Sequence, residues 1–91
     1  MTETAEARLK RLQMRAWRRG TKEMDLVMGP YADARLAGMD DATLAAFDAL
    51  QGENDQDLMQ WVLGQVPPPA AHAALVADMA AFARGRLIAR N

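Results

Sequence analysis

Apolar residues recur along this chain at spacings of three and four residues, the period of an amphipathic helix. The pattern predicts five helices, over about residues 3–19, 21–37, 40–51, 54–63 and 69–84. No stretch alternates apolar and polar residues as a half-buried strand does. The positions expected to face the core are Ala5, Leu9, Leu12 and Ala16 in the first helix, Met24, Val27, Met28 and Tyr31 in the second, Leu44, Phe47 and Leu50 in the third, Leu58, Trp61 and Val62 in the fourth, and Leu75, Val76, Met79, Phe82 and Ala83 in the last.

Composition favours the same fold class. The chain has 19 alanines against nine Val, Ile and Thr residues together, and alanine loses least on entering a helix. Its 91 residues, of which 51% are hydrophobic, suffice for one small core. We therefore predict an all-α protein, a compact five-helix bundle that forms a single small domain over residues 1–91 with flexible ends.

Glycines and capping residues mark the expected helix ends. Asp40 is a typical N-cap, and Met39 and Leu44 have the spacing of a hydrophobic staple around it. Asn54 or Asp55 is expected to cap the fourth helix. Glycine often ends a helix because it adopts the left-handed conformation without strain. Five of the six glycines fall where a helical pattern closes, namely Gly20, Gly38, Gly52, Gly64 and Gly85.

The prolines divide the pattern further. Pro30 lies inside the second helix, and it must kink or divide that helix because it has no N–H to donate. We favour one kinked helix to about residue 37. Pro67, Pro68 and Pro69 form a stiff connector, and Pro69 can open the last helix.

Few side chains here could carry chemistry. The chain has no cysteine, no serine and one histidine, which excludes a disulfide scaffold, a Cys-ligated metal and a Ser or Cys nucleophile. His72 lies one turn before Leu75 on the apolar stripe, so we interpret it as a boundary or core residue. Asp55 and Asp57 are interpreted as first-turn charges of a helix. We predict no catalytic residue and no metal site, and a stand-alone enzyme is the least favoured function.

Charge is unevenly distributed although the net charge is only −1. Residues 1–22 hold seven Lys and Arg against two acids, residues 23–83 hold one Arg against ten acids, and residues 84–91 add three Arg. The basic first helix suggests one possible function, a helical adaptor that binds an unrelated protein or an anionic surface. The downstream acids oppose this interpretation by repulsion, and we expect no nucleic-acid partner.

No apolar run approaches the roughly 20 residues of a membrane-spanning helix, so we expect no membrane span. The first ten residues lack the charged and apolar order of an export signal, and they do not read as a transit peptide. The expected compartment is therefore the cytoplasm.

The junction from Trp17 to Asp25 places three basic and two acidic groups around Gly20. In one interpretation Gly20 is a helix C-cap among solvated charges. In the other the junction is a docking corner, where Gly20 lets another backbone approach, Arg19 contacts a carboxylate on a partner, and Glu23 pairs with a basic group there. Trp61 is expected in the core, whereas Trp17 lies either at the core rim or in an exposed contact.

Two motifs in this sequence resemble those of a known family. Residues Arg19 to Glu23 match the Arg-Gly-x-x-Glu signature of the SdhE family, the FAD assembly factors of succinate dehydrogenase, within a similar context from Arg18 to Leu26. Residues Asp55 to Trp61 resemble the family's Asp-x-Asp-Leu-x-x-Trp segment, followed by Gly64. The similarity covers roughly residues 8–85. It departs from the family at Thr21, where methionine is common.

The resemblance implies a compact bundle of five helices and a role as an assembly factor. Family members promote covalent attachment of FAD to the flavoprotein subunit of succinate dehydrogenase, and in some bacteria of fumarate reductase. The bond joins the flavin to a histidine of that subunit. The resemblance therefore implies a chaperone that is not an enzyme and binds no cofactor stably, since FAD belongs to the partner flavoprotein.

The resemblance also indicates which residues contact the partner. Carried over by position, these are Arg19, Gly20 and Glu23, with Arg18, Asp25 and Trp17 as weaker additions. Asp57 and Trp61 match family positions that are equally consistent with structural roles. We expect a monomer, and a homodimer through the Met24 and Met28 face is the alternative.

Overall fold

The computed structural model describes residues 3–89, with the side chains described as far as residue 86. It contains five α-helices, α1 (Ala5–Ala16), α2 (Lys22–Arg35), α3 (Asp41–Gln51), α4 (Asp55–Val62) and α5 (Ala73–Ala89). Two short 3₁₀ helices, η1 (Leu36–Gly38) and η2 (Ala70–His72), precede α3 and α5. No strand occurs in residues 3–89. The predicted all-α fold with five helices is confirmed.

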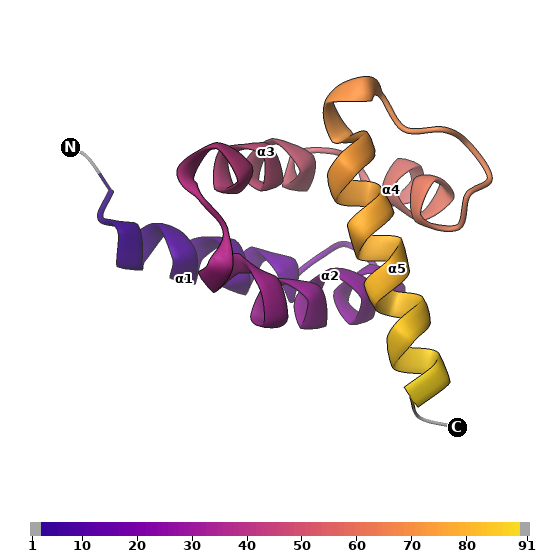
Figure 1. The fold of residues 1–91 in the computed structure, drawn as a ribbon, viewed down its shortest axis with the longest axis horizontal. Coiled ribbons are helices and arrows are strands. Elements are labelled where there is room, and N and C mark those ends of the chain that lie inside the picture. The colour runs from indigo at the N-terminus through magenta and orange to yellow at the C-terminus, as the bar shows by residue number, and fades with distance from the viewer. Residues whose placement is uncertain (1–2, 90–91) are drawn as a thin grey trace.

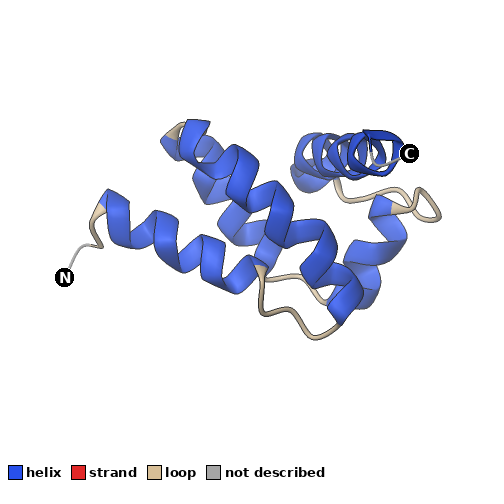
Figure 2. Cartoon of the chain, turned by 90° about the horizontal axis from the view of Figure 1, so that it is seen from below, coloured by secondary structure: helices blue, strands red, loops and turns tan. Residues whose placement is uncertain are grey.

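Helices α1, α2 and α3 run back and forth, each reversing the direction of the one before (Figure 1). Helix α5 crosses this group steeply, and it is seen end-on when the molecule is viewed from below (Figure 2). It packs against α2 and α4, while α1 packs mainly against α2. The loop between α1 and α2 thereby lies on the same side of the molecule as the short connection between α3 and α4.

Four helices begin at a side-chain cap, as the sequence pattern indicates for α3 and α4. Thr4, Thr21, Asp40 and Asn54 each accept a hydrogen bond from the backbone N–H three residues later. Each such bond satisfies one of the four N–H groups that a helix start leaves unpaired. Of the two candidates for capping α4, the structure selects Asn54. The capping hydrogen bonds also hold the pKa of Asp40 below its ordinary value.

The glycines divide into those that end helices and those that do not. Gly64 has a φ of 77° and closes a Schellman motif after α4, in which Gln65 and Gly64 donate to the carbonyls of Gln60 and Trp61. Gly52 is the C-cap of α3, and Gly38 is the last residue of η1. The expectation that Gly20 and Gly85 also end helices is wrong, because α1 ends at Ala16 ahead of Gly20 and α5 continues through Gly85.

Helix α2 continues through Pro30 without a break. Proline removes the N–H that would have bonded to the carbonyl four residues earlier, that of Leu26. The Arg86 guanidinium of α5 donates to this carbonyl oxygen at 3.1 Å. A contact from a distant helix therefore replaces the missing bond. Pro69 precedes the last helix as the N-cap of η2, and α5 itself begins at Ala73.

The hydrophobic core forms where the apolar faces of the five helices meet. Its fully buried large side chains are Leu12, Met24, Met28, Tyr31, Leu36, Phe47, Leu50, Leu58 and Met79. Tyr31 stacks on Phe47, meets the edge of Phe82 and donates from its hydroxyl to Asp78 at 2.7 Å. Burial, and then this hydrogen bond, raise the pKa of Tyr31. Because Met24 and Met28 lie in this core, they offer no exposed face for a homodimer.

Candidate functional site

The junction between α1 and α2, which we call the Gly20 corner (residues 17–25), rests on the connection between α3 and α4. Arg19 is the centre of this contact. Its Nε lies 2.9 Å from Asp55 Oδ1, and the side chains of Arg19 and Asp55 are only 9% and 11% exposed. The two Nη atoms donate to the carbonyls of Gln51 and Glu53, each at 2.7 Å. Arg19 therefore ties the corner to a segment more than thirty residues away.

The end of α3 explains why an arginine fits at this point. The last carbonyls of a helix have no partner within it and carry its negative partial charge. Gln51 is the last residue of α3, and Glu53 follows in the connection. A guanidinium has five N–H donors in a planar fork, so Arg19 can bind these two carbonyls and a carboxylate at once.

Asp55 contacts the loop itself with its second oxygen. The Thr21 N–H donates to Oδ2 at 2.9 Å, while the Arg19 N–H donates to the carboxylate of Asp25. A Cβ on Gly20 would lie 3.0 Å from the same Oδ2, closer than such contacts normally are. Gly20 has no left-handed φ, so it is needed here for this close approach and not for a helix cap.

The outer face of the Gly20 corner is accessible. Gly20, Arg18 and Glu23 are exposed, together with Thr21 and Lys22. A cavity of about 410 Å³ beside the corner is lined by Arg19, Gly20, Thr21, Asn54, Asp55 and Gln56. A partner segment can therefore approach the backbone at Gly20. A larger cavity, about 780 Å³ between α2, α3 and the start of α5, is lined by none of the corner's residues.

Trp17 lies on the surface of α2. Its indole covers Gly29, where an added Cβ would come within 2.4 Å of the ring, and its Nε1 donates to Asp33 at 3.1 Å. Trp17 remains 41% exposed, so it is at the core rim with one face available to a partner. Gly29 is thus the small residue that makes room for the aromatic ring.

The predicted site residues therefore separate into two layers. Gly20, Glu23, Arg18 and Trp17 are on the outside. Arg19 and Asp25 turn inward, and the carboxylate that Arg19 contacts is Asp55 of the same chain. Sequence reasoning interpreted Asp55 as a first-turn charge of α4, which it is, but did not pair it with Arg19. The one sign of this pairing in the sequence was that Asp55 belongs to the second family motif, residues 55–61, which the fold brings beside the first motif, residues 19–23.

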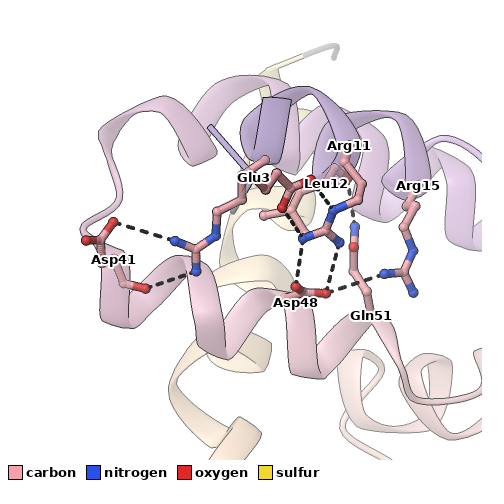
Figure 3. Close-up of polar contacts among 8 residues, drawn as sticks. Glu3, Arg11, Leu12, Arg15, Asp41, Asp48 and Gln51 are labelled. Atoms are coloured by element: carbon pink, nitrogen blue, oxygen red, sulfur yellow. Dashed lines mark hydrogen bonds and ion pairs between the residues drawn. The ribbon is translucent and has the colours of Figure 1, made fainter. Parts of the chain in front are cut away.

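The basic face of α1 pairs with acids within the chain (Figure 3). Arg11 lies 2.8 Å from Glu3 and 3.1 Å from Asp48, and Arg15 also contacts Asp48. The hydrogen bonds of Arg11 hold the pKa of Glu3 and of Asp48 below their ordinary values. The two carboxylates in turn raise the pKa of Arg11.

These ion pairs bear on the adaptor hypothesis. Arg8 lies 3.6 Å from Asp41 on α3, so Arg8, Arg11 and Arg15 all have acidic partners in the same molecule. The charge available to an anionic surface is reduced accordingly. The basic residues of α1 hold this helix against α3, and the adaptor hypothesis is not favoured.

His72 occupies a boundary position, as expected. Its side chain is 12% exposed, its Nε2 lies 3.2 Å from Glu53, and its ring lies 5.8 Å from that of Trp61. Trp61 is 9% exposed and belongs to the core. Within the part of the chain that the structure describes, no group of three or more His, Cys, Asp or Glu residues could hold a metal ion. No helix in that part is both long enough and apolar enough to cross a bilayer.

Comparison with known proteins identifies relatives of this chain. Residues 10–83 match the family described as "Flavinator of succinate dehydrogenase". The mitochondrial succinate dehydrogenase assembly factor 2 of Mycosarcoma maydis is 36% identical over 72 residues, which are 79% of this chain and 30% of that protein. The corresponding protein of Cryptococcus neoformans is 37% identical over 60 residues, which are 66% of this chain and 34% of that protein.

A bacterial relative is similar at the same level. The FAD assembly factor SdhE of Acetobacter pasteurianus is 33% identical over 67 residues, which are 74% of this chain and 62% of that protein. The match thus spans about a third of the fungal relatives and less than two thirds of the bacterial one. Since the family match covers most of the chain and includes both motifs, this protein belongs to the family of flavinators of succinate dehydrogenase.

Proposed function

We propose that this chain binds the flavoprotein subunit of succinate dehydrogenase and promotes covalent attachment of FAD to that subunit. Family membership supports this proposal, as do the names of the relatives, which describe succinate dehydrogenase assembly and FAD assembly. The observation that carries it is the Gly20 corner, where Gly20 and Glu23 of the Arg-Gly-x-x-Glu motif are exposed while Arg19 anchors the loop from beneath through its ion pair with Asp55.

The proposed role is that of a binding factor and not of an enzyme. The chain has no serine or cysteine and one histidine, which is engaged with Glu53 and Trp61. The reacting atoms therefore belong to the flavin and to a histidine of the partner. Holding two reacting groups in the right geometry can lower the activation barrier of a reaction by up to about 7–11 kcal/mol. A protein that fixes the partner's conformation contributes in this way without reacting.

We assign the partner contact to the outer face of the Gly20 corner. Gly20 has no side chain to obstruct a partner backbone, and the exposed carboxylate of Glu23 is available to a basic group. Arg18 and Trp17 extend this surface along the end of α1. Arg19 and Asp25 contribute from beneath by holding the loop in place.

Further features of the proposal concern partners, cofactor and compartment. Fumarate reductase is a second flavoprotein that the chain would serve, and FAD stays with the partner. We propose a monomer, because Met24 and Met28 are in the core. We also propose the cytoplasm as the compartment, by analogy with the bacterial relative.

The test is covalent flavin in a strain that lacks the gene. We expect the denatured flavoprotein subunit to lose its in-gel flavin fluorescence, and a plasmid copy of the wild-type gene to restore it. An immunoblot shows that the amount of subunit is unchanged. A copy that encodes Glu23→Ala should produce a folded protein yet fail to restore fluorescence. Undiminished fluorescence in the deletion strain would contradict the proposed function.

A pull-down at low and high salt separates this function from the adaptor alternative. Recovery of the flavoprotein at both salt concentrations supports the proposal. Recovery of nucleic acid or lipid without flavoprotein, lost as salt increases, would support an anionic-surface adaptor.

A further inference from the structure

Asp55 stands at the first position of α4, yet α4 does not need its side chain in order to begin. The N-cap is Asn54, whose side-chain oxygen accepts the Asp57 N–H at 2.8 Å. Both oxygens of Asp55 instead point to the Gly20 corner. One meets the Arg19 Nε and the other the Thr21 N–H, each at 2.9 Å. The carboxylate thus spans Gly20, which lies between these two residues.

This arrangement fixes the backbone on either side of Gly20. Thr21 is also the N-cap of α2, whose first turn carries Glu23. A shift of the Asp55 carboxylate would release the Thr21 N–H and the Arg19 side chain together. The orientation of the start of α2, and with it the place of Glu23 relative to Gly20, depends on this carboxylate.

We propose that Asp55 is a positioning residue for the recognition of the flavoprotein. The inference rests on the proposed function and extends it to a residue outside the Arg-Gly-x-x-Glu motif. Asp55 holds Arg19, Gly20 and Thr21 in the shape that the partner binds, and it does so from beneath the surface. The two motifs of this chain are therefore one functional unit, in which the second motif sets the geometry of the first.

The test uses Asp55→Asn in the full chain, with Asp41→Asn as its matched control. Asp41 occupies the same position in α3, directly after the N-cap, and its side chain is fully exposed. Both variants remove one negative charge from the first turn of a helix. The asparagine at position 55 keeps the size of the side chain, but its amide nitrogen cannot accept one of the two donated hydrogen bonds.

Two measurements are made on each variant. The first is the dissociation constant for the purified flavoprotein subunit. We expect Asp55→Asn to weaken binding about tenfold, within the range found for residues that act on a site without touching its ligand, and Asp41→Asn to leave it unchanged. The second is amide hydrogen exchange in the free protein, which reports local opening. The Thr21 amide should lose protection in Asp55→Asn, while the core amides of α3 and α5 keep theirs.

A merely structural role would accelerate exchange throughout the chain, so a global loss of protection overturns the inference. Equal binding by Asp55→Asn and wild type overturns it too, as does an equal loss in Asp41→Asn. If Asp55→Asn does not fold, Asp55→Glu replaces it, because the longer side chain keeps the charge but moves the carboxylate away from its places beside the Arg19 Nε and the Thr21 N–H. In that case full protection of the Thr21 amide or unchanged binding overturns the inference. Failure of the wild-type chain to bind the flavoprotein refutes the proposed function itself.

Discussion

Two glycines inside helices give opposite predictions when each is replaced by alanine. Gly29 lies in α2 beneath the indole of Trp17, and Gly85 lies in α5 with nothing within 4 Å of an added Cβ. Alanine in place of glycine in a helix interior is favourable by about 1 kcal/mol. Gly85→Ala should therefore raise the free energy of unfolding. At Gly29 the same gain is opposed by the loss of the Trp17 contact.

The magnitude follows from the geometry. An added Cβ at Gly29 would lie 2.4–2.7 Å from three atoms of the indole ring, so Trp17 must move away. Trp17 is 41% exposed, so about three fifths of a side chain of about 250 Å² is covered. At about 25 cal/mol per Å², complete exposure would cost about 4 kcal/mol, an upper bound. After the helix-propensity gain, we expect a net loss of about 1–3 kcal/mol.

Thermal unfolding and tryptophan quenching measure the two parts of this prediction. A loss of about 1 kcal/mol lowers the Tm of a domain of this size by about 4–8 °C. Acrylamide should quench Gly29→Ala more than wild type, and since Trp61 is buried the difference reports on Trp17. In a Trp17→Ala background, Gly29→Ala should become stabilising. A rise in Tm for Gly29→Ala in the wild-type background would refute the reasoning.

Three further outcomes are expected. Arg19→Ala should lower the free energy of unfolding by about 3 kcal/mol, because it breaks a buried ion pair. Glu23→Ala should change the free energy of unfolding by less than about 0.5 kcal/mol, because Glu23 is exposed. Urea denaturation measures both values. Because Arg11 lowers the pKa of Asp48, the stability that this pair contributes is complete above the ordinary carboxyl pKa and disappears as the pH falls through the lowered pKa of Asp48. A series of Tm measurements at acidic pH should therefore show a smaller fall in Tm for Asp48→Asn than for wild type. Tyr31 is the one tyrosine of the chain, and because its pKa is raised in the folded state, its contribution to stability is complete below about pH 10 and declines above that pH. Tyrosinate absorbance should therefore appear together with loss of helical circular dichroism. Tyrosinate absorbance at about pH 10 in protein that is still folded would contradict the burial of Tyr31.

The five helices and most of their ends could be predicted from local patterns in the sequence. Helical periodicity and N-caps act within one or two turns, so Asp40 could be recognised as a cap from its neighbours alone, and the cap of α4 could be narrowed to Asn54 or Asp55. The same local rules misjudged Gly20 and Gly85. A glycine tolerates a helix end but does not impose one, and its cost inside a helix is only about 1 kcal/mol. The resemblance to a family also lay in the sequence, in two motifs whose spatial relation was unknown.

Which charged groups meet could not be predicted from the sequence, because it depends on how the helices pack. Arg19 and Asp55 are 36 positions apart, and no local pattern distinguishes an arginine that binds its own chain from one that binds a partner. Their contact exists because the packing of α1, α2 and α3 brings the two loops together. The contact of Arg86 with the carbonyl freed by Pro30 arises in the same way, between residues 60 positions apart. Such pairs depend on how helices dock, which side-chain periodicity does not encode.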